Sequence, residues 1–225
     1  ISIRETKAPK GYKLDSKVYT FTIDKNDQFS NVELNLGNIP ELKNEPLIPE
    51  IKTTAMSENT KNNVGEYGKK IRIIDKVSYK ELSEGETYTI KGKLMDKEMG
   101  KPLKDKDGKD ITAEKTFTVT KENSVINGDG ARGEVEPLYE IDSTLLKGKT
   151  IVVFEKLFYD GKEIASHEDI NDEAQSVHFP EIKTVAKSKE SGTNIGSPSK
   201  EETIIDIVKY NNLILGKEYL SLIHI

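Results

Sequence analysis

The sequence predicts an all-β protein built from tandem Ig-like antiparallel β-sandwich modules. Short segments rich in β-branched and aromatic residues alternate with turn signals along the 225 residues. No segment shows a convincing apolar period of 3.6 residues, so long helices are not expected. One long stretch of sequence also occurs twice in the same register. Many short strands separated by turns favour antiparallel sandwiches, and a repeat of this length indicates whole modules.

The expected strands alternate polar and apolar residues, which places every second side chain on one face of a sheet. The run Thr150–Glu155 is expected to be a buried strand that ends on its carboxylate. Glycine-containing turn signals lie at 106–109, 128–130, 147–148 and 159–161. In chain order, the expected strands lie at 18–23, 32–36, 51–53, 73–79, 88–91, 116–119 and 150–155.

The internal repeat defines the predicted modules. Pro49–Thr53 recurs as Pro180–Thr184, 131 residues later, and the same offset relates Tyr88 to Tyr219 without a gap. Chance matches would not keep one register over this distance. We therefore expect three parts: the C-terminal part of one module (1–45), a complete module (46–179) and the truncated start of a second copy (180–225).

Composition restricts the classes of function. Lysine and arginine are interleaved with acidic residues at a net charge of −5, and no basic stripe indicates a nucleic-acid partner. No apolar run approaches membrane-spanning length. The chain has no cysteine, which excludes disulfides. Neither a cofactor nor a metal is expected: residues 105–110 fit a solvated turn better than a calcium loop, and His178 and His224 have no nearby ligands in the sequence.

Five polar residues lie at positions that the strand pattern would bury, or shortly after such positions. Thr53 shares the inward face of Ile51, whereas Thr54 points outward. The other four are Asp75 inside a strand, Glu155 after an apolar run, and His167 and Gln175 eight residues apart. Each residue taken alone is more often structural than chemical. Their joint arrangement is what indicates chemistry.

The segments 75–96, 152–155 and 167–175 are similar to the VaFE-repeat family of Gram-positive surface proteins, which includes the ester-bond domains of clostridial-type adhesins. In that family a threonine on the first strand is joined to a glutamine near the last strand, with loss of ammonia. The resemblance implies that Thr53 is the nucleophile and Gln175 the acyl donor. It also implies roles for Asp75 and Glu155 as a carboxyl pair and for His167 in handling the proton.

This chemistry is reasonable for these side chains. A glutamine amide is a poor acceptor, so its carbonyl needs an acid and its ammonia needs a proton. Two carboxyl groups held together in an apolar setting cannot both ionise, so one stays protonated and can donate. A neutral histidine can take the threonine proton. The reaction happens once per molecule, so the chain is not expected to be an enzyme.

The flanking parts carry incomplete sites. Residues 5–12 resemble the E-box of CnaB/SpaA-type pilin domains, in which a glutamate assists an isopeptide bond between a lysine and an asparagine. Glu5 matches the glutamate, and Asn38 is the expected asparagine because Asn35 faces the other way; the partner lysine would lie before Ile1. In the second copy, Thr184 and Asp206 match Thr53 and Asp75. The remaining groups have no equivalents there, so no crosslink is predicted.

The function expected from these features is a structural stalk module of a secreted, cell-wall-anchored adhesin or pilus-like protein, stiffened by a Thr53–Gln175 ester. Its partners would be the neighbouring modules of the same chain. One alternative is an adhesin domain that binds a host protein or glycan. A second alternative is an acyl-transfer enzyme that uses Thr53 and His167.

Overall fold

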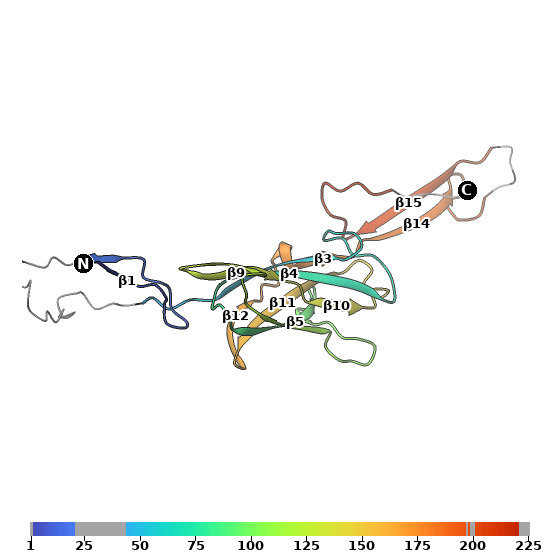
Figure 1. Cartoon of the computed structure of the whole chain (residues 1–225). Helices are drawn as coiled ribbons and strands as arrows, with labels where there is room; N and C mark the ends of the chain where they lie inside the picture. Colours follow the sequence, from blue (N-terminus) through green and yellow to red (C-terminus); the bar gives the residue numbers. More distant parts are fainter. Residues whose placement is uncertain (1, 21–43, 197, 199–200, 221–225) are drawn as a thin grey trace, which may run out of the picture.

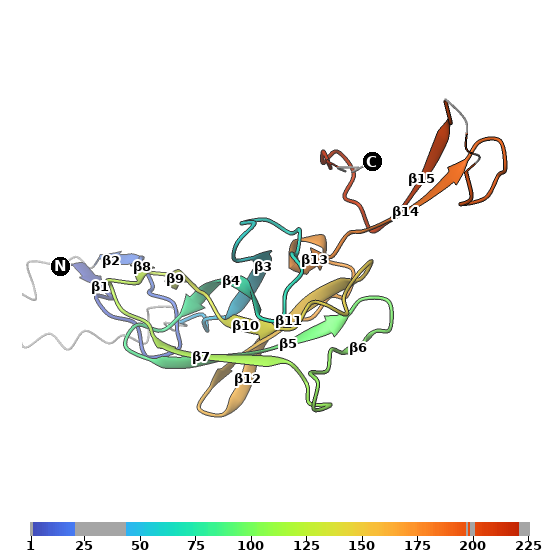
Figure 2. The ribbon, with the colours of Figure 1, turned by 90° about the vertical axis from the view of Figure 1, so that its right-hand side faces the viewer.

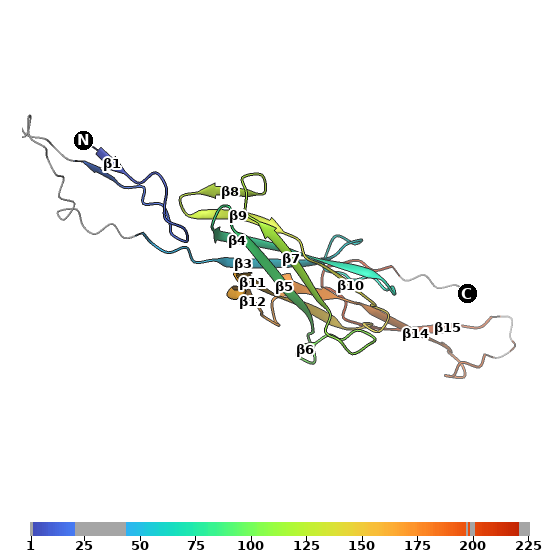
Figure 3. The same ribbon diagram turned by 60° about the horizontal axis from the view of Figure 1, so that its bottom comes forward.

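The computed structural model describes residues 2–20, 44–196, 198 and 201–220. Nearly all of its regular secondary structure is strand, which confirms the predicted all-β class. A central sandwich carries a two-stranded ribbon at each end, and the ribbons lie at opposite ends of an elongated molecule (Figures 1 and 3). The N-terminal ribbon pairs β1 (Ser2–Arg4) with β2 (Val18–Thr20), and the C-terminal ribbon pairs β14 (Glu181–Ser188) with β15 (Ile204–Asn211).

The first sheet of the sandwich is organised around its longest strand, β4. That strand pairs antiparallel with β3 on one side and with β9 and β10 on the other. Strand β8 continues the sheet beyond β9. The bounds are β3 (Glu50–Ser57), β4 (Ile71–Leu82), β8 (Ser124–Asn127), β9 (Gly130–Val135) and β10 (Leu138–Ile141).

The second sheet is organised around β11, which pairs with β5 along its whole length. Two short strands share the other edge of β11: β12 pairs with its second half and β13 with its start. The 3₁₀ helix η3 (Glu173–Gln175) leads directly into β13. The strand bounds are β5 (Thr87–Asp96), β6 (Lys101–Pro102), β7 (Thr112–Thr118), β11 (Thr150–Tyr159), β12 (Lys162–His167) and β13 (Ser176–His178).

The core lies between the two sheets, which face each other in Figures 1 and 2. Strands β3 and β4 bury alternate residues as the sequence predicts. Each large aliphatic side chain buried in this way contributes about 1.5–3 kcal/mol. Fully buried residues come from both sheets and include Ile73, Val77, Leu82, Ile90, Leu94, Ile151, Leu157 and Phe179.

The structure changes one detail of the predicted strands. Strand β11 continues to Tyr159, so Glu155 lies in the middle of the strand rather than at its end. The expected strand 18–23 is described only as far as Thr20, and the one at 32–36 lies outside the described residues. The turn signal after Tyr159 is confirmed: Asp160 and Gly161 have φ of 47° and 72°, the left-handed pair that a two-residue hairpin needs.

Candidate crosslink site

Thr53 and Asp75 reach the interior from adjacent strands. Thr53 pairs with Val77 and Ala55 pairs with Asp75, so the two polar residues are diagonal neighbours on one face of the sheet. Thr53 is 3% exposed and Asp75 is fully buried, whereas Thr54 is exposed. The alternation therefore distinguishes Thr53 from Thr54, as expected from the sequence.

Glu155 and His167 come from the opposite sheet, where they form a cross-strand pair between β11 and β12. Glu155 is fully buried. The imidazole of His167 crosses to the first sheet, with Nδ1 3.2 Å from Thr53 Oγ1. Its other nitrogen, Nε2, lies 3.1 Å from Oδ2 of Asp172. The threonine hydroxyl is thus one end of a hydroxyl–imidazole–carboxylate chain.

Gln175 occupies the gap that β12 and β13 leave on the edge of β11. Strand β13 pairs as far as Val152 and β12 begins at Glu155, so the carbonyl of Val153 has no strand partner on that side. Gln175 Nε2 donates to this carbonyl at 2.7 Å and to the His167 carbonyl at 3.0 Å. The amide nitrogen is therefore fixed at both hydrogens, and the amide plane is fixed with it.

The acceptor oxygens of the site lack ordinary donors. Both oxygens of Asp75, Oε2 of Glu155 and Oε1 of Gln175 are buried without a hydrogen-bond donor. Burial raises the pKa of Asp75. Burial, and next the charge of Asp75, raises the pKa of Glu155. Two carboxyl groups buried in this setting do not readily ionise together, and a proton kept by the pair would supply a donor within the site.

Two residues that the sequence reasoning missed complete the pocket. Tyr139, on β10, is 1% exposed and donates to Glu155 Oε1 at 2.5 Å. Burial raises the pKa of its hydroxyl, so the group remains a donor. Gly92 pairs with Glu155 across β5 and β11. A Cβ at Gly92 would lie 1.8 Å from the Tyr139 hydroxyl, so the pocket requires glycine there.

A third missed residue is Asp172, the N-cap of η3. It accepts from the backbone N–H of Ala174 through Oδ1 and contacts His167 through Oδ2. The same carboxylate therefore fixes the start of the helix that carries Gln175 and the orientation of the imidazole. In the sequence it was one acidic residue among several between His167 and Gln175, with no signal of its own.

In the N-terminal part, Glu5 contacts an asparagine that the sequence analysis did not single out. The side-chain amide of Asn44 donates to both carboxylate oxygens of Glu5, at 2.9 Å each, and to the Lys13 carbonyl at 3.1 Å. Asn38 lies outside the described residues. Asn44 is therefore the amide that the structure brings to Glu5.

The second copy begins with the same hairpin register. Thr184 pairs with Val208, and Ala186 pairs with Asp206, as their counterparts do in β3 and β4. Thr184 is exposed and Asp206 is half-buried. The absence of a crosslink in this part stays a prediction.

His178, for which no metal ligands were expected, has hydrogen-bonding partners in the folded module. Its Nδ1 lies 2.9 Å from Thr150 Oγ1, and its Nε2 contacts Glu173. These are hydrogen-bonding contacts: within the described ranges no group of three or more acidic or histidine side chains could hold a metal ion. His224 lies outside the described residues. No helix in the described part of the chain is a candidate for crossing a membrane.

Comparison with protein families identifies the central module. The family model described as a T-Q ester bond containing domain matches residues 49–179 and again 180–222. These matches cover more than half of the chain, which therefore belongs to the T-Q ester bond domain family. A model described as SpaA, a prealbumin-like fold domain, matches residues 1–37. The resemblances seen in the sequence are thus confirmed for both families.

Solved structures give distant likenesses. An adhesin from Mobiluncus mulieris, described as containing intramolecular disulfide, isopeptide and ester bond crosslinks, is 16% identical, with a TM-score of 0.48 over 73% of this chain and 74% of that one. A putative β-galactosidase from Bacteroides fragilis is 13% identical, with a TM-score of 0.38 over 61% of this chain and 18% of that one. Such similarity carries no functional assignment. No match was found among curated proteins.

Proposed function

We propose that residues 46–179 form an autocatalytic ester between Thr53 and Gln175, and that the chain is a stalk segment of a secreted, cell-wall-anchored adhesin or pilus-like protein. One observation carries the proposal. A buried threonine hydroxyl on β3 contacts an imidazole nitrogen, and the same histidine's carbonyl holds the amide of the buried Gln175. Membership of the T-Q ester bond family supports it.

His167 is the base for the threonine hydroxyl. The carboxylate of Asp172 accepts the N–H of Nε2, which leaves the lone pair of Nδ1 directed at Thr53 Oγ1. As Oγ1 attacks the amide carbon, its proton moves to Nδ1. The imidazolium formed in this step is stabilised by Asp172, as in other hydroxyl–imidazole–carboxylate arrangements.

The carboxyl pair is the acid for the amide. Gln175 Oε1 gains negative charge in the attack, and no neutral donor reaches it among the described residues. The proton held by Asp75 and Glu155 can be donated to this oxygen, and Tyr139 fixes Glu155 in place. The Oγ1–Cδ bond forms in this attack. When the tetrahedral intermediate collapses, the Cδ–Nε2 bond breaks, Oε1 returns its proton to the carboxyl pair, and ammonia leaves with the proton that His167 carried.

The bond would join the two sheets at their load-carrying strands. Thr53 lies on β3, the first strand of the module, and Gln175 directly precedes β13, the last. A crosslink between them encloses a loop of about 120 residues. Closing this loop lowers the entropy of the unfolded chain, which raises the free energy of unfolding by roughly 5 kcal/mol. Force applied along the chain would bypass the enclosed strands. This would give a cysteine-free chain the effect of a disulfide.

The proposal is tested by mapping the bond. Proteolysis of the wild-type chain should give one branched peptide that contains Thr53 and Gln175, and hydroxylamine at high pH should divide it. Thr53→Ala and Gln175→Ala should each give two separate peptides. The matched variant Thr54→Ala, at the outward-facing position, should keep the branched peptide. Separate peptides from the wild type would overturn the proposal.

A further inference from the structure

Two residues at equivalent positions have the same uncommon backbone conformation. Glu81 and Asn212 lie 131 residues apart, and their φ angles are 58° and 56°. Glu81 lies one residue before the end of β4, and Asn212 follows the end of β15. Left-handed φ is unusual for a residue other than glycine, so its repetition points to a feature built into the module.

The hairpins around these residues also repeat. The eight strand pairs from Glu50–Lys80 to Ser57–Ile73 recur at the same offset between β14 and β15. The loop contacts recur as well: the N–H of Ser57 donates to the Asn62 carbonyl, as that of Ser188 does to Thr193. The local fold that presents Glu81 is therefore the one that presents Asn212.

Glu81 contacts both the part of the chain that precedes its module and the first residues of the module itself. Its Oε2 accepts from the N–H of Ile48 at 2.9 Å and lies 3.4 Å from Nζ of Lys13. The Ile48 hydrogen bond, with a smaller contribution from Lys13, lowers the pKa of Glu81, which keeps the carboxylate charged.

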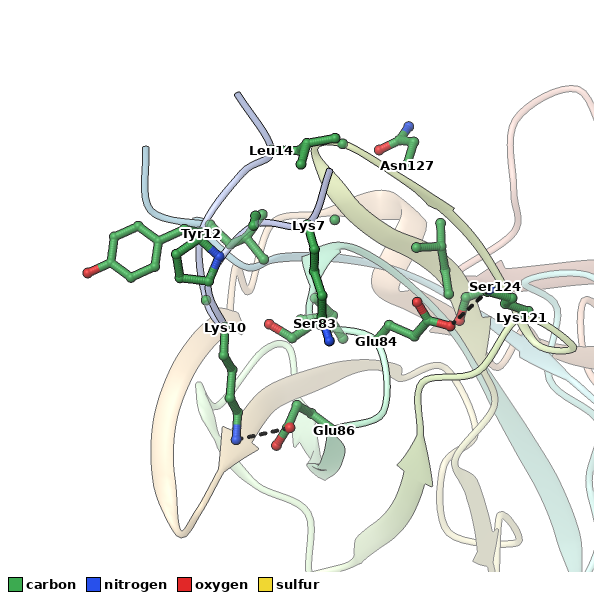
Figure 4. Close-up of a pocket in the computed structure, with 18 of the residues that line it drawn as sticks. Lys7, Lys10, Tyr12, Leu14, Ser83, Glu84, Glu86, Lys121, Ser124 and Asn127 are labelled. Carbon is green, nitrogen blue, oxygen red and sulfur yellow. Dashed lines mark ion pairs between the residues drawn. The ribbon is translucent and has the colours of Figure 1, made fainter. Parts of the chain in front are cut away.

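Other contacts at this first boundary are also ion pairs and hydrogen bonds. Lys10 forms an ion pair with Glu86 at 3.0 Å, as Figure 4 shows in the cleft between the two parts. The N–H of Leu14 donates to the Gly128 carbonyl at 2.8 Å. Cation meets anion and donor meets acceptor across the boundary.

Asn212 makes the corresponding contacts at the second boundary, with different chemistry. Its Nδ2 donates to the Lys149 carbonyl at 2.5 Å, and its Oδ1 accepts from the Thr150 hydroxyl at 3.1 Å. Nδ1 of His178 lies 2.9 Å from the same hydroxyl oxygen of Thr150. Glu173 contacts the other nitrogen of that ring. The amide thus meets one acceptor and one donor of the preceding module.

We propose that this left-handed position at the end of the second strand is the docking residue of each module, and that its side chain matches the surface of the module before it. At the first boundary an acid forms an ion pair with Lys13 of the preceding part and also accepts from a backbone N–H at the start of its own module. An amide meets a carbonyl and a hydroxyl at the second. The surface around Lys149, Thr150 and His178 is accordingly a docking site for the next module of the same chain.

Docking at this position fixes the angle between successive modules. At the second boundary, two directed hydrogen bonds from a side chain on a constrained backbone permit little rotation, whereas a simple linker would permit much. The inference rests on the proposed stalk function only for the reason that docking would be useful. Its geometry does not depend on whether Thr53 and Gln175 are joined.

The test measures the distance between the central module and the C-terminal ribbon in the full chain. The chain has no cysteine, so spin labels can be placed through Lys115→Cys on β7 and Lys209→Cys on β15, both at exposed positions. Pulsed electron spin resonance should give one narrow distance distribution for the otherwise wild-type chain. Asn212→Gly keeps the left-handed backbone but removes both hydrogen bonds, and it should raise the undocked fraction by about tenfold.

Thr150→Val should broaden the distribution in the same direction, because it removes the hydroxyl that Asn212 accepts from. The matched controls are Asn194→Gly, in the exposed loop of the ribbon, and Thr112→Val, on β7, and both should leave the distribution narrow. A broad distribution in the starting chain, or a narrow one in Asn212→Gly, would overturn the inference. The mass of each labelled protein reports the Thr53–Gln175 bond separately, so failure of one proposal is distinguishable from failure of the other.

Discussion

The burial of Asp75 and Glu155 is not explained by a contribution to the stability of the fold. Both carboxyl groups lie in the core, and burial raises the pKa of each. Neither has a lysine or arginine partner among the described ion pairs. Burying such a pair destabilises the folded state unless the two groups share a proton. The arrangement is explained if that proton is required for the amide reaction.

This burial predicts how the stability of an uncrosslinked variant depends on pH. In Thr53→Ala the pair remains buried, and its folded-state pKa lies above the ordinary value of about 4. The folded state then binds more protons than the unfolded state, so the free energy of unfolding falls as pH rises from about 4 towards the raised pKa. Urea unfolding at several pH values across this range measures the free energy of unfolding. A free energy that rises with pH throughout would contradict the shared proton.

Tyr139 should affect the rate of bond formation more than the fold. Tyr139→Phe removes the donor to Glu155 Oε1 while keeping the ring in the core. Loss of one hydrogen bond to a carboxyl group should slow ester formation by about tenfold. The rate is measured as loss of mass with time in freshly purified protein. Tyr88→Phe, which removes a hydroxyl that accepts from Ser83 elsewhere in the core, is the control and should leave the rate unchanged.

At the scale of the elements, the sequence predicted the strands and the buried face of β3 and β4 because period-two alternation is a local signal. It did not predict the end of β11. An acid after an apolar run looked like the boundary of the strand, whereas Glu155 is tolerated inside it because Tyr139 and Asp75 come from the opposite sheet.

The residues that were missed depend on contacts between distant elements. Tyr139 stands at an alternating apolar position and reads as a core aromatic residue, since nothing local reveals the partner of its hydroxyl. Asn44 reaches Glu5 from 39 residues away in the sequence, a contact that no local pattern indicates. His178 appeared isolated because Thr150 and Glu173 approach it only in the folded module.

The ester should stabilise the sandwich by tying β3 to η3. Compared with the wild type, Gln175→Ala should lose about 5 kcal/mol of unfolding free energy from the open loop. Guanidinium unfolding of both proteins measures the difference, with Thr54→Ala as a control that should retain the wild-type value. Equal stabilities for Gln175→Ala and the wild type would contradict a crosslink between these elements.

At the scale of the whole molecule, the repeat was the strongest signal in the sequence because it needs no knowledge of structure. The ribbon β14–β15 reproduces the register of β3–β4 pair by pair. The sequence could not predict how consecutive parts meet, because those contacts join residues such as Thr150 and Asn212 that share no local pattern. An elongated chain of docked modules is the form that the proposed stalk requires.

The central claim is tested most directly by the intact mass of the freshly purified chain. The wild type should weigh less than its sequence by one ammonia, whereas Thr53→Ala, Gln175→Ala and Glu155→Ala should each have the full mass calculated for their sequence. A wild-type chain with its full calculated mass would contradict the ester. So would a deficit of one ammonia that persists in Thr53→Ala.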